Sequence, residues 1–161
     1  MDKKTCTACA DRNILEDIKD NISKYGFTVI GTSVETEYDF HLDMTYSIGI
    51  QSTYNLPDII IFGLPTEIAY TFINMILDRM KKEGPVLPDI DYLKFAQGFP
   101  TRFKDISPEA IEKYMIQAVN YYQTSRLDVV QLIFPDSKGK WAHEDGCEKA
   151  SKITSDMTEN L

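Results

Sequence analysis

Three stretches of the chain carry apolar residues at the spacing of one helical face. The first runs from about residue 11 to residue 25, and Gly26 follows it as a helix stop. The second covers residues 64–83, where Ile68, Phe72 and Met75 belong to the apolar stripe together with Ile76 and Met80. The third begins where a serine N-cap precedes a proline and covers residues 107–122. The pattern therefore predicts three main helices.

Between these helices, short β-branched or alternating runs predict strands. The run 58–63 is continuously apolar, which is typical of a strand buried on both faces. Strands that follow one another through short turns pair antiparallel. We therefore expect an α+β domain with one curved, largely antiparallel, barrel-like sheet and three main helices packed outside it. The expected strands are 27–34, 42–50, 58–63, 92–95, 102–106 and 127–134, with a return strand beginning at Lys140–Trp141.

The length of 161 residues suits one domain, which we place at residues 1–150, followed by a polar, disordered tail at 151–161. The longest nearly uncharged apolar run, Ile59–Leu64, is far shorter than the ~20 residues that a membrane span needs. No apolar stretch follows Met1, so we expect a cytoplasmic protein with no membrane partner.

The net charge of −8 argues against nucleic acid as a partner, because proteins that bind nucleic acid usually present a basic face. An acidic surface instead suits an adaptor or inhibitor that meets a basic protein, and we keep that function as an alternative.

Four segments, taken in order from about residue 6 to residue 147, resemble one known family. They are Cys6-Thr-Ala-Cys9 before the first helix, Thr45–Ile50, Leu56–Pro65, and Val130–Asp136 with Gly139-Lys-Trp141. Together they resemble a small bacterial family known only as a domain of unknown function (number 4262). In that family Leu and Trp often stand where this chain has Ile50 and Phe134. The resemblance implies a single domain and supplies no activity and no catalytic residue.

Cysteine and histidine residues gather at the two ends of the chain. Cys6 and Cys9 form one pair, and His143 and Cys147 form another. Three thiolates and one imidazole are the ligands of a closed tetrahedral Zn²⁺ site, which would clamp the two ends together. Two other interpretations stay open: an unbound N-terminal arm with an ordinary surface histidine, and a CxxC redox pair.

Catalytic patterns are weak in this sequence. It has no phosphate-binding loop, no dinucleotide fingerprint and no Gly-x-Ser-x-Gly. His41 and Ser47 can share one face of a strand, but they would lie ~20 Å apart. A hydrolase or transferase that uses His41 or His143 with an acidic partner remains an alternative.

The leading hypothesis is non-catalytic binding, which includes sequestration, of a small anionic or nucleotide-like molecule by a compact domain that self-associates. A helix N-terminus after Gly63 offers free N–H groups to an anion, and Arg102 can grip a phosphate. The other expected contacts are residues on strands and strand ends that suit a polar, planar ligand: Tyr46, Ser47, Gly49, Gln131, Asp136 and Trp141.

Overall fold

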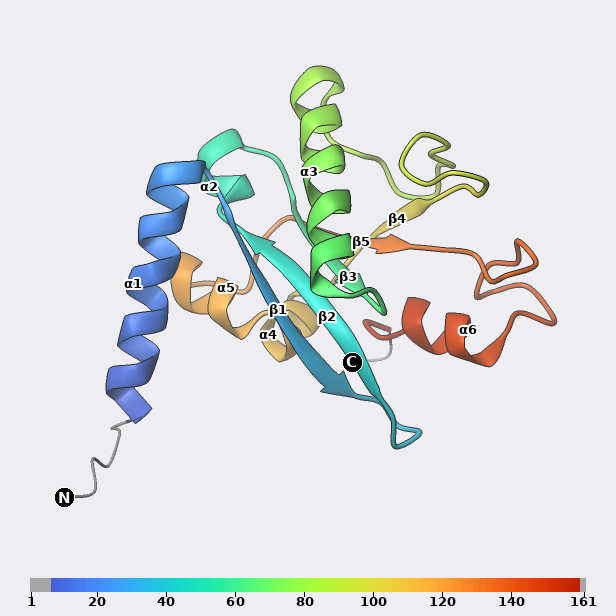
Figure 1. Ribbon diagram of the computed structural model, residues 1–161, viewed down its shortest axis with the longest axis horizontal. Coiled ribbons are helices and arrows are strands. Elements are labelled where there is room, and N and C mark those ends of the chain that lie inside the picture. Colours follow the sequence, from blue (N-terminus) through green and yellow to red (C-terminus); the bar gives the residue numbers. More distant parts are fainter. Residues whose placement is uncertain (1–6, 160–161) are drawn as a thin grey trace.

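Five strands form one mixed sheet in the computed structural model, which describes residues 7–159 and side chains from residue 13 onward (Figure 1). Their order across the sheet is β1-β2-β3-β5-β4. β3 and β5 are parallel, and the other neighbouring strands are antiparallel. The strands are β1 (Thr28–Glu35), β2 (His41–Ile48), β3 (Asp58–Phe62), β4 (Arg102–Asp105) and β5 (Val129–Ile133).

The α+β class is confirmed, but the sheet is open, so the barrel-like shape that we expected is not found. β1 and β4 are its two edges and do not meet. Sequence reasoning paired each strand with the next one through a turn. Between β3 and β5 the chain instead forms a helix, the edge strand β4 and two further helices. β5 then lies beside β3 in parallel, which requires a crossover connection. The sheet is therefore mixed.

Helices cover both faces of the sheet (Figure 1). α1, α4 and α5 pack on one face around Tyr46 and Phe62, whereas α3 packs on the other face around Ile59 and Ile61. Both faces of the central strands are therefore buried, which agrees with the continuous apolar run of β3. The helices of the described residues are α1 (Thr7–Tyr25), α2 (Ile50–Tyr54), α3 (Thr66–Glu83), α4 (Pro108–Tyr114), α5 (Ile116–Tyr122) and α6 (Lys149–Ser155).

Several expected elements differ from the structure. The helix expected at 107–122 is divided at Met115, and residues 92–95 contribute only an isolated bridge between Tyr92 and Thr101. Lys140–Trp141 form no strand, because the loop after β5 folds around a carboxylate instead. α6 spans residues 149–155 and so crosses the boundary at residue 150 that we placed between the domain and its tail. None of the described helices combines the length and apolar character that crossing a bilayer requires.

Candidate functional site

A cavity of about 400 Å³ lies where the parallel strands β3 and β5 end. We call it the carboxyl-end crevice. In open sheets with parallel strands, ligands commonly bind outside the carboxyl ends of these strands. Its walls come from the strand ends, from α3, from the loop before β4 and from α6. The lining residues are Leu42, Phe62, Gly63, Leu64, Phe72, Phe99, Leu132, Ile133, Phe134, Ala150, Ser151, Thr154 and Ser155.

Aromatic rings form one side of the crevice. The rings of Phe72 and Phe134 meet edge to face with centroids 5.6 Å apart, and those of Phe99 and Phe134 do so at 5.9 Å. Phe99 is 42% exposed, so its ring lies at the mouth. α6 contributes the hydroxyl residues Ser151, Thr154 and Ser155 to the lining. The lining therefore combines flat apolar surfaces with a few hydroxyl groups.

Gln131, on β5, holds α6 in place at the crevice. Its Nε2 donates to the carbonyl oxygens of Thr154 and Ser155, both at 3.3 Å, and its Oε1 accepts from Thr158 at 2.7 Å. The Lys104 ammonium also donates to the Ser155 carbonyl. Gly63 lets α6 approach, because its φ is 86° and a Cβ there would lie 3.0 Å from Thr154 Cγ2. Of the predicted binding residues, Gly63 and Gln131 thus belong to this site, one in its lining and one in its support.

Asp136 organises the loop that joins β5 to α6. Its carboxylate accepts the backbone N–H groups of Lys138, Lys140 and Glu148 at 2.8–2.9 Å. The bond from Glu148 is the main reason that the pKa of Asp136 lies below its usual range. With these bonds made, Asp136 holds the loop in place and does not face the crevice as a free acceptor.

Arg102 and Trp141 contact each other, but Arg102 is already engaged. Its guanidinium lies 4.1 Å from the centroid of the Trp141 ring, and its Nε lies 2.5 Å from the carboxylate of Asp91. The indole is 7% exposed. These residues join the loop before β4 to the loop after β5, and neither lines the crevice.

Tyr46, Ser47 and Gly49 lie at the other end of β2, away from the crevice. Tyr46 is buried in the core, which raises its pKa to about 12, and its hydroxyl accepts the N–H of Gln117 at 3.3 Å. Ser47 donates to Asp58 at 2.7 Å, and Gly49 donates its N–H to the Tyr122 hydroxyl at 2.9 Å. The eight predicted binding residues therefore do not converge on one pocket.

Sequence reasoning missed Asp58, the most deeply buried carboxylate with a shifted pKa. It accepts bonds from Ser47, from Tyr122 and from the N–H groups of Ile50 and Gln51. Burial raises the pKa of Asp58 to about 6, and these bonds oppose that rise. The sequence signal that could have pointed to Asp58 is a carboxylate at the first residue of a strand that is buried on both faces. The Asp58 oxygens cap α2, and through all its bonds the carboxylate joins β2, α2, β3 and α5.

The two histidines lie on exposed segments. His41 Nε2 is 3.8 Å from Glu35 Oε1, and these side chains are 66% and 82% exposed. His143 is exposed in the loop before α6. Neither histidine lines the crevice.

The zinc hypothesis concerns residues that are only partly described. Cys6 and the side chain of Cys9 lie outside the described residues. Cys147 is half-buried, with its Sγ 3.8 Å from the Lys140 carbonyl, and burial with the nearby Asp136 charge raises the pKa of its thiol. Within the described part of the chain, no three His, Cys, Asp or Glu side chains converge as metal ligands would. The four-ligand set stays a prediction.

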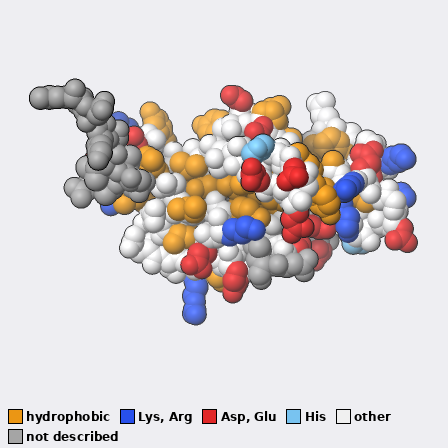
Figure 2. Space-filling model, turned by 90° about the horizontal axis from the view of Figure 1, so that it is seen from below, with side chains coloured by type: hydrophobic (Ala, Val, Ile, Leu, Met, Phe, Trp, Pro, Cys, Tyr) orange, Lys and Arg blue, Asp and Glu red, His pale blue; other side chains and the backbone are white. Residues whose placement is uncertain are grey.

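A second cavity, of about 340 Å³, separates the β1–β2 hairpin from α4 and α6. Its lining mixes lysines with carboxylates: Lys152 lies 3.6 Å from Asp156, and Glu159 lies 3.0 Å from Lys104, which is outside the lining. Figure 2 looks onto this end of the molecule, where acidic and basic side chains intermingle on the right-hand half. Charged residues make up much of this lining, whereas the lining of the crevice is mostly apolar and aromatic, so the crevice is the better candidate for a ligand.

Comparison with known proteins gives one family. The model of the family described as "Domain of unknown function (DUF4262)" matches residues 21–148. The match covers most of the chain, including β1 through β5, and excludes both Cys6-x-x-Cys9 and α6. No curated protein and no solved structure matches the chain.

Proposed function

The chain belongs to the DUF4262 family, and for it we propose a binding function: the carboxyl-end crevice holds a small planar molecule, such as a nucleobase or another heteroaromatic ring, without converting it. The observation that carries this proposal is the lining of the crevice, which combines phenyl rings with hydroxyl residues of α6.

The shape and chemistry of the lining support a planar ligand. Ligand pockets are mostly apolar and aromatic, with a few polar groups that fix orientation. Phenyl edges and faces favour another aromatic ring at stacking or edge-to-face distance. The hydroxyl of Ser151 can donate to or accept from the ring nitrogens and exocyclic groups of a heterocycle. A volume of about 400 Å³ accommodates a one- or two-ring molecule.

Binding without conversion is supported by where the titratable groups lie. The crevice lining contains apolar, hydroxyl and glycine residues only. The carboxylates with shifted pKa values, Asp58 and Asp136, direct their oxygens at hydrogen-bond donors of the fold. General acid–base catalysis needs a titratable group within hydrogen-bond reach of the substrate. A ligand in the crevice would meet no such side chain among the lining residues.

An anionic part of the ligand would extend out of the crevice, because the lining supplies no cationic side chain. The proposal therefore ranks bases and nucleosides ahead of nucleotides. A phosphate that hangs in solvent adds little affinity, since exposed charges interact weakly in water.

A thermal-shift screen tests the proposal. The panel should contain nucleobases, nucleosides, nucleotides and non-nucleotide heteroaromatics. A ligand at about 100 times its Kd adds about 2.7 kcal/mol and should raise the Tm by about 5–10 °C. A panel in which no planar compound raises the Tm would contradict the proposal.

Two variants of one loop locate the ligand. Phe99→Ala removes a ring of the crevice mouth, whereas Leu93→Ala removes an apolar side chain that is 72% exposed and lies outside the lining. We expect Phe99→Ala to lower affinity at least about tenfold and Leu93→Ala to leave it unchanged. Equal effects from the two variants would place the ligand elsewhere.

A further inference from the structure

The outer edge of β1 has hydrogen-bonding groups that the described residues leave unpaired. The hairpin begins with the N–H of Thr36 bonded to the carbonyl of Phe40, at 2.9 Å. Bonded and non-bonded pairs alternate along an antiparallel ladder. In the register of β1 with β2, the even-numbered residues of β1 therefore bond to β2. Val29, Gly31, Ser33 and Glu35 direct their N–H and C=O groups at the free edge.

The other edge of the sheet is partly covered. The N–H of Asp89 reaches the carbonyl of Phe103, and Tyr92 exchanges two backbone bonds with Thr101, at the start of β4. β1 has no comparable cover among the described residues. It is also twice as long as β4, with eight residues against four, and it contains no proline and no lysine. Proteins usually protect such an edge, so a long and open one that is charged only at Glu35 indicates a pairing surface.

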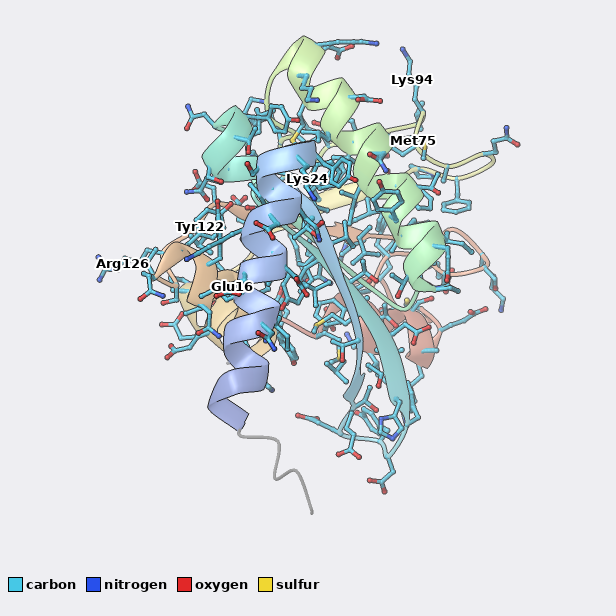
Figure 3. All side chains as sticks on the ribbon, turned by 60° about the vertical axis from the view of Figure 1, so that its left-hand side comes forward. Glu16, Lys24, Met75, Lys94, Tyr122 and Arg126 are labelled. Atoms are coloured by element: carbon cyan, nitrogen blue, oxygen red, sulfur yellow. The ribbon has the colours of Figure 1, made fainter. Side chains whose placement is uncertain are left out.

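A groove runs along the N-terminal half of β1 at this edge. It lies between α1 and α3, beside residues 27–29, and its volume is about 690 Å³. Its walls are aromatic: Phe27 and Tyr70 stack with centroids 6.5 Å apart, and Tyr25 is 69% exposed. Figures 1 and 3 show α1 and β1 diverging toward the hairpin, so the C-terminal half of β1 lies clear of α1.

We propose that β1 pairs antiparallel with β1 of a second copy of this chain, around a twofold axis at Thr32. Outward-facing residues must then meet outward-facing residues, so Gly31 bonds to the partner's Ser33, and Val29 to the partner's Glu35. The two sheets become one continuous sheet of ten strands. With the axis at Thr32, every residue of β1 lies opposite a residue of the second copy, beginning with residue 28 opposite residue 36.

This register places the hairpin of each copy in the groove of the other. Residues 35–38 of the partner lie opposite residues 26–29, which border the groove. The partner's segment carries Glu35 and Glu37. Lys24 stands on the last turn of α1, on the side of β1 and α3 (Figure 3). Lys24 can then pair with the partner's Glu37 at both ends of the twofold pair, against one like charge, Glu67, in the groove lining. This pairing favours a second copy over an unrelated neutral strand.

Measurement of the molar mass in solution tests the proposal. By light scattering across the micromolar range, the wild-type chain should approach twice the mass of one chain. Ser33→Pro removes an outward N–H and leaves the β1–β2 ladder intact, so it should weaken the dimer at least about tenfold. Thr32→Lys sets two ammonium groups opposite each other and should do the same, whereas Thr32→Ser should remain dimeric.

The variants must keep the fold for this result to count, which a circular-dichroism melt checks for each. A wild-type chain that is monomeric at high micromolar concentration overturns the proposal. The edge and groove would then bind a strand of another protein. A dimer that resists both Ser33→Pro and Thr32→Lys overturns it as well.

Disulfide trapping tests the register. In a chain whose Cys6, Cys9 and Cys147 are replaced by serine, Thr32→Cys should form a symmetric crosslink, because facing residues of a non-bonded pair lie ~4.5 Å apart at Cα. Glu35→Cys should not crosslink, since its copies would lie ~20 Å apart along the strands. Trapping of Glu35→Cys instead of Thr32→Cys overturns the register and the proposed interface.

Discussion

The hydroxyl of Tyr122 donates a 2.7 Å hydrogen bond to the carboxylate of Asp58, which lies 64 residues earlier in the chain. The same hydroxyl accepts the N–H of Gly49 at 2.9 Å. One phenol therefore ties the end of α5 to the start of β3 and to the turn before α2. Tyr122 lies on α5 beside α1 in Figure 3. Because Asp58 is fully buried, the bond joins these elements inside the fold.

Removal of this hydroxyl should destabilise the chain. Tyr122→Phe keeps the ring but deletes a bond to a buried charged group, so we expect the free energy of unfolding to fall by about 1.5–3 kcal/mol. Urea denaturation followed by circular dichroism measures it.

The neighbouring tyrosine provides the control. The hydroxyl of Tyr121 makes an exposed contact, 3.2 Å from Ser52 Oγ, and the substitution keeps the ring and its packing on Tyr122. Tyr121→Phe should therefore change stability by less than about 0.5 kcal/mol. Equal losses from the two substitutions would show that the Asp58 bond contributes nothing specific.

Asp58 should also make stability depend on pH. Burial raises its pKa from an ordinary value of 3.8 to about 6 in the folded chain. The folded chain then binds this proton more tightly than the unfolded chain. The contribution of Asp58 is fully present below pH 3.8 and is lost as the pH rises through about 6. It corresponds to at most about 3 kcal/mol.

Asp58→Asn isolates this effect, because an amide does not titrate and the other groups are shared. The difference in unfolding free energy, wild type minus variant, should fall between pH 4 and pH 7. A difference that rises over this range would mean that the four donors hold the pKa of Asp58 below its ordinary value.

Gln131 should control the order of α6. Gln131→Leu preserves the approximate volume but deprives the carbonyls of Thr154 and Ser155 of their amide donor. We expect a loss of about 1–3 kcal/mol. Hydrogen exchange should quicken in α6 while α3, which Gln131 does not contact, keeps its protection. Unchanged exchange in α6 would show that the helix is anchored by other contacts.

The zinc hypothesis has a separate test. If Cys6, Cys9, His143 and Cys147 hold Zn²⁺, the protein purified without chelator should contain about one zinc per chain, and Cys147→Ser should lower that content. A wild-type content below about 0.2 zinc per chain would remove the hypothesis.

Local patterns predicted the main elements well, and pairing rules predicted the sheet less well. The helix expected at 64–83 appears as α3 (Thr66–Glu83). Ile76 and Met80 of the expected stripe are buried together with Ala69, Ile73 and Leu77, but Ile68 and Met75 are 49% and 36% exposed. Five apolar residues at helical spacing do not reveal which side meets the sheet. The parallel pairing of β3 with β5 was equally hidden, because it joins segments about 70 residues apart.

The site was harder to predict than the fold. Of the eight predicted binding residues, Gly63 lines the crevice and Gln131 bonds to α6, whereas the other six make contacts elsewhere in the fold or its loops. A polar residue in a strand indicates a hydrogen bond without revealing whether its partner is a ligand or the chain itself. The three phenyl rings that contact one another in the crevice come from α3, from the loop before β4 and from the end of β5. Only tertiary structure brings these three segments together.

Chemical-shift mapping tests most directly whether the crevice holds a planar molecule. Backbone amide spectra of the labelled protein would be recorded during titration with the strongest compound from the thermal-shift panel. We predict saturable shifts at Gly63, Leu64, Phe134, Ser151 and Thr154, which line the crevice. Saturable shifts confined to residues outside this lining, or no shifts with any planar compound, would contradict the proposal.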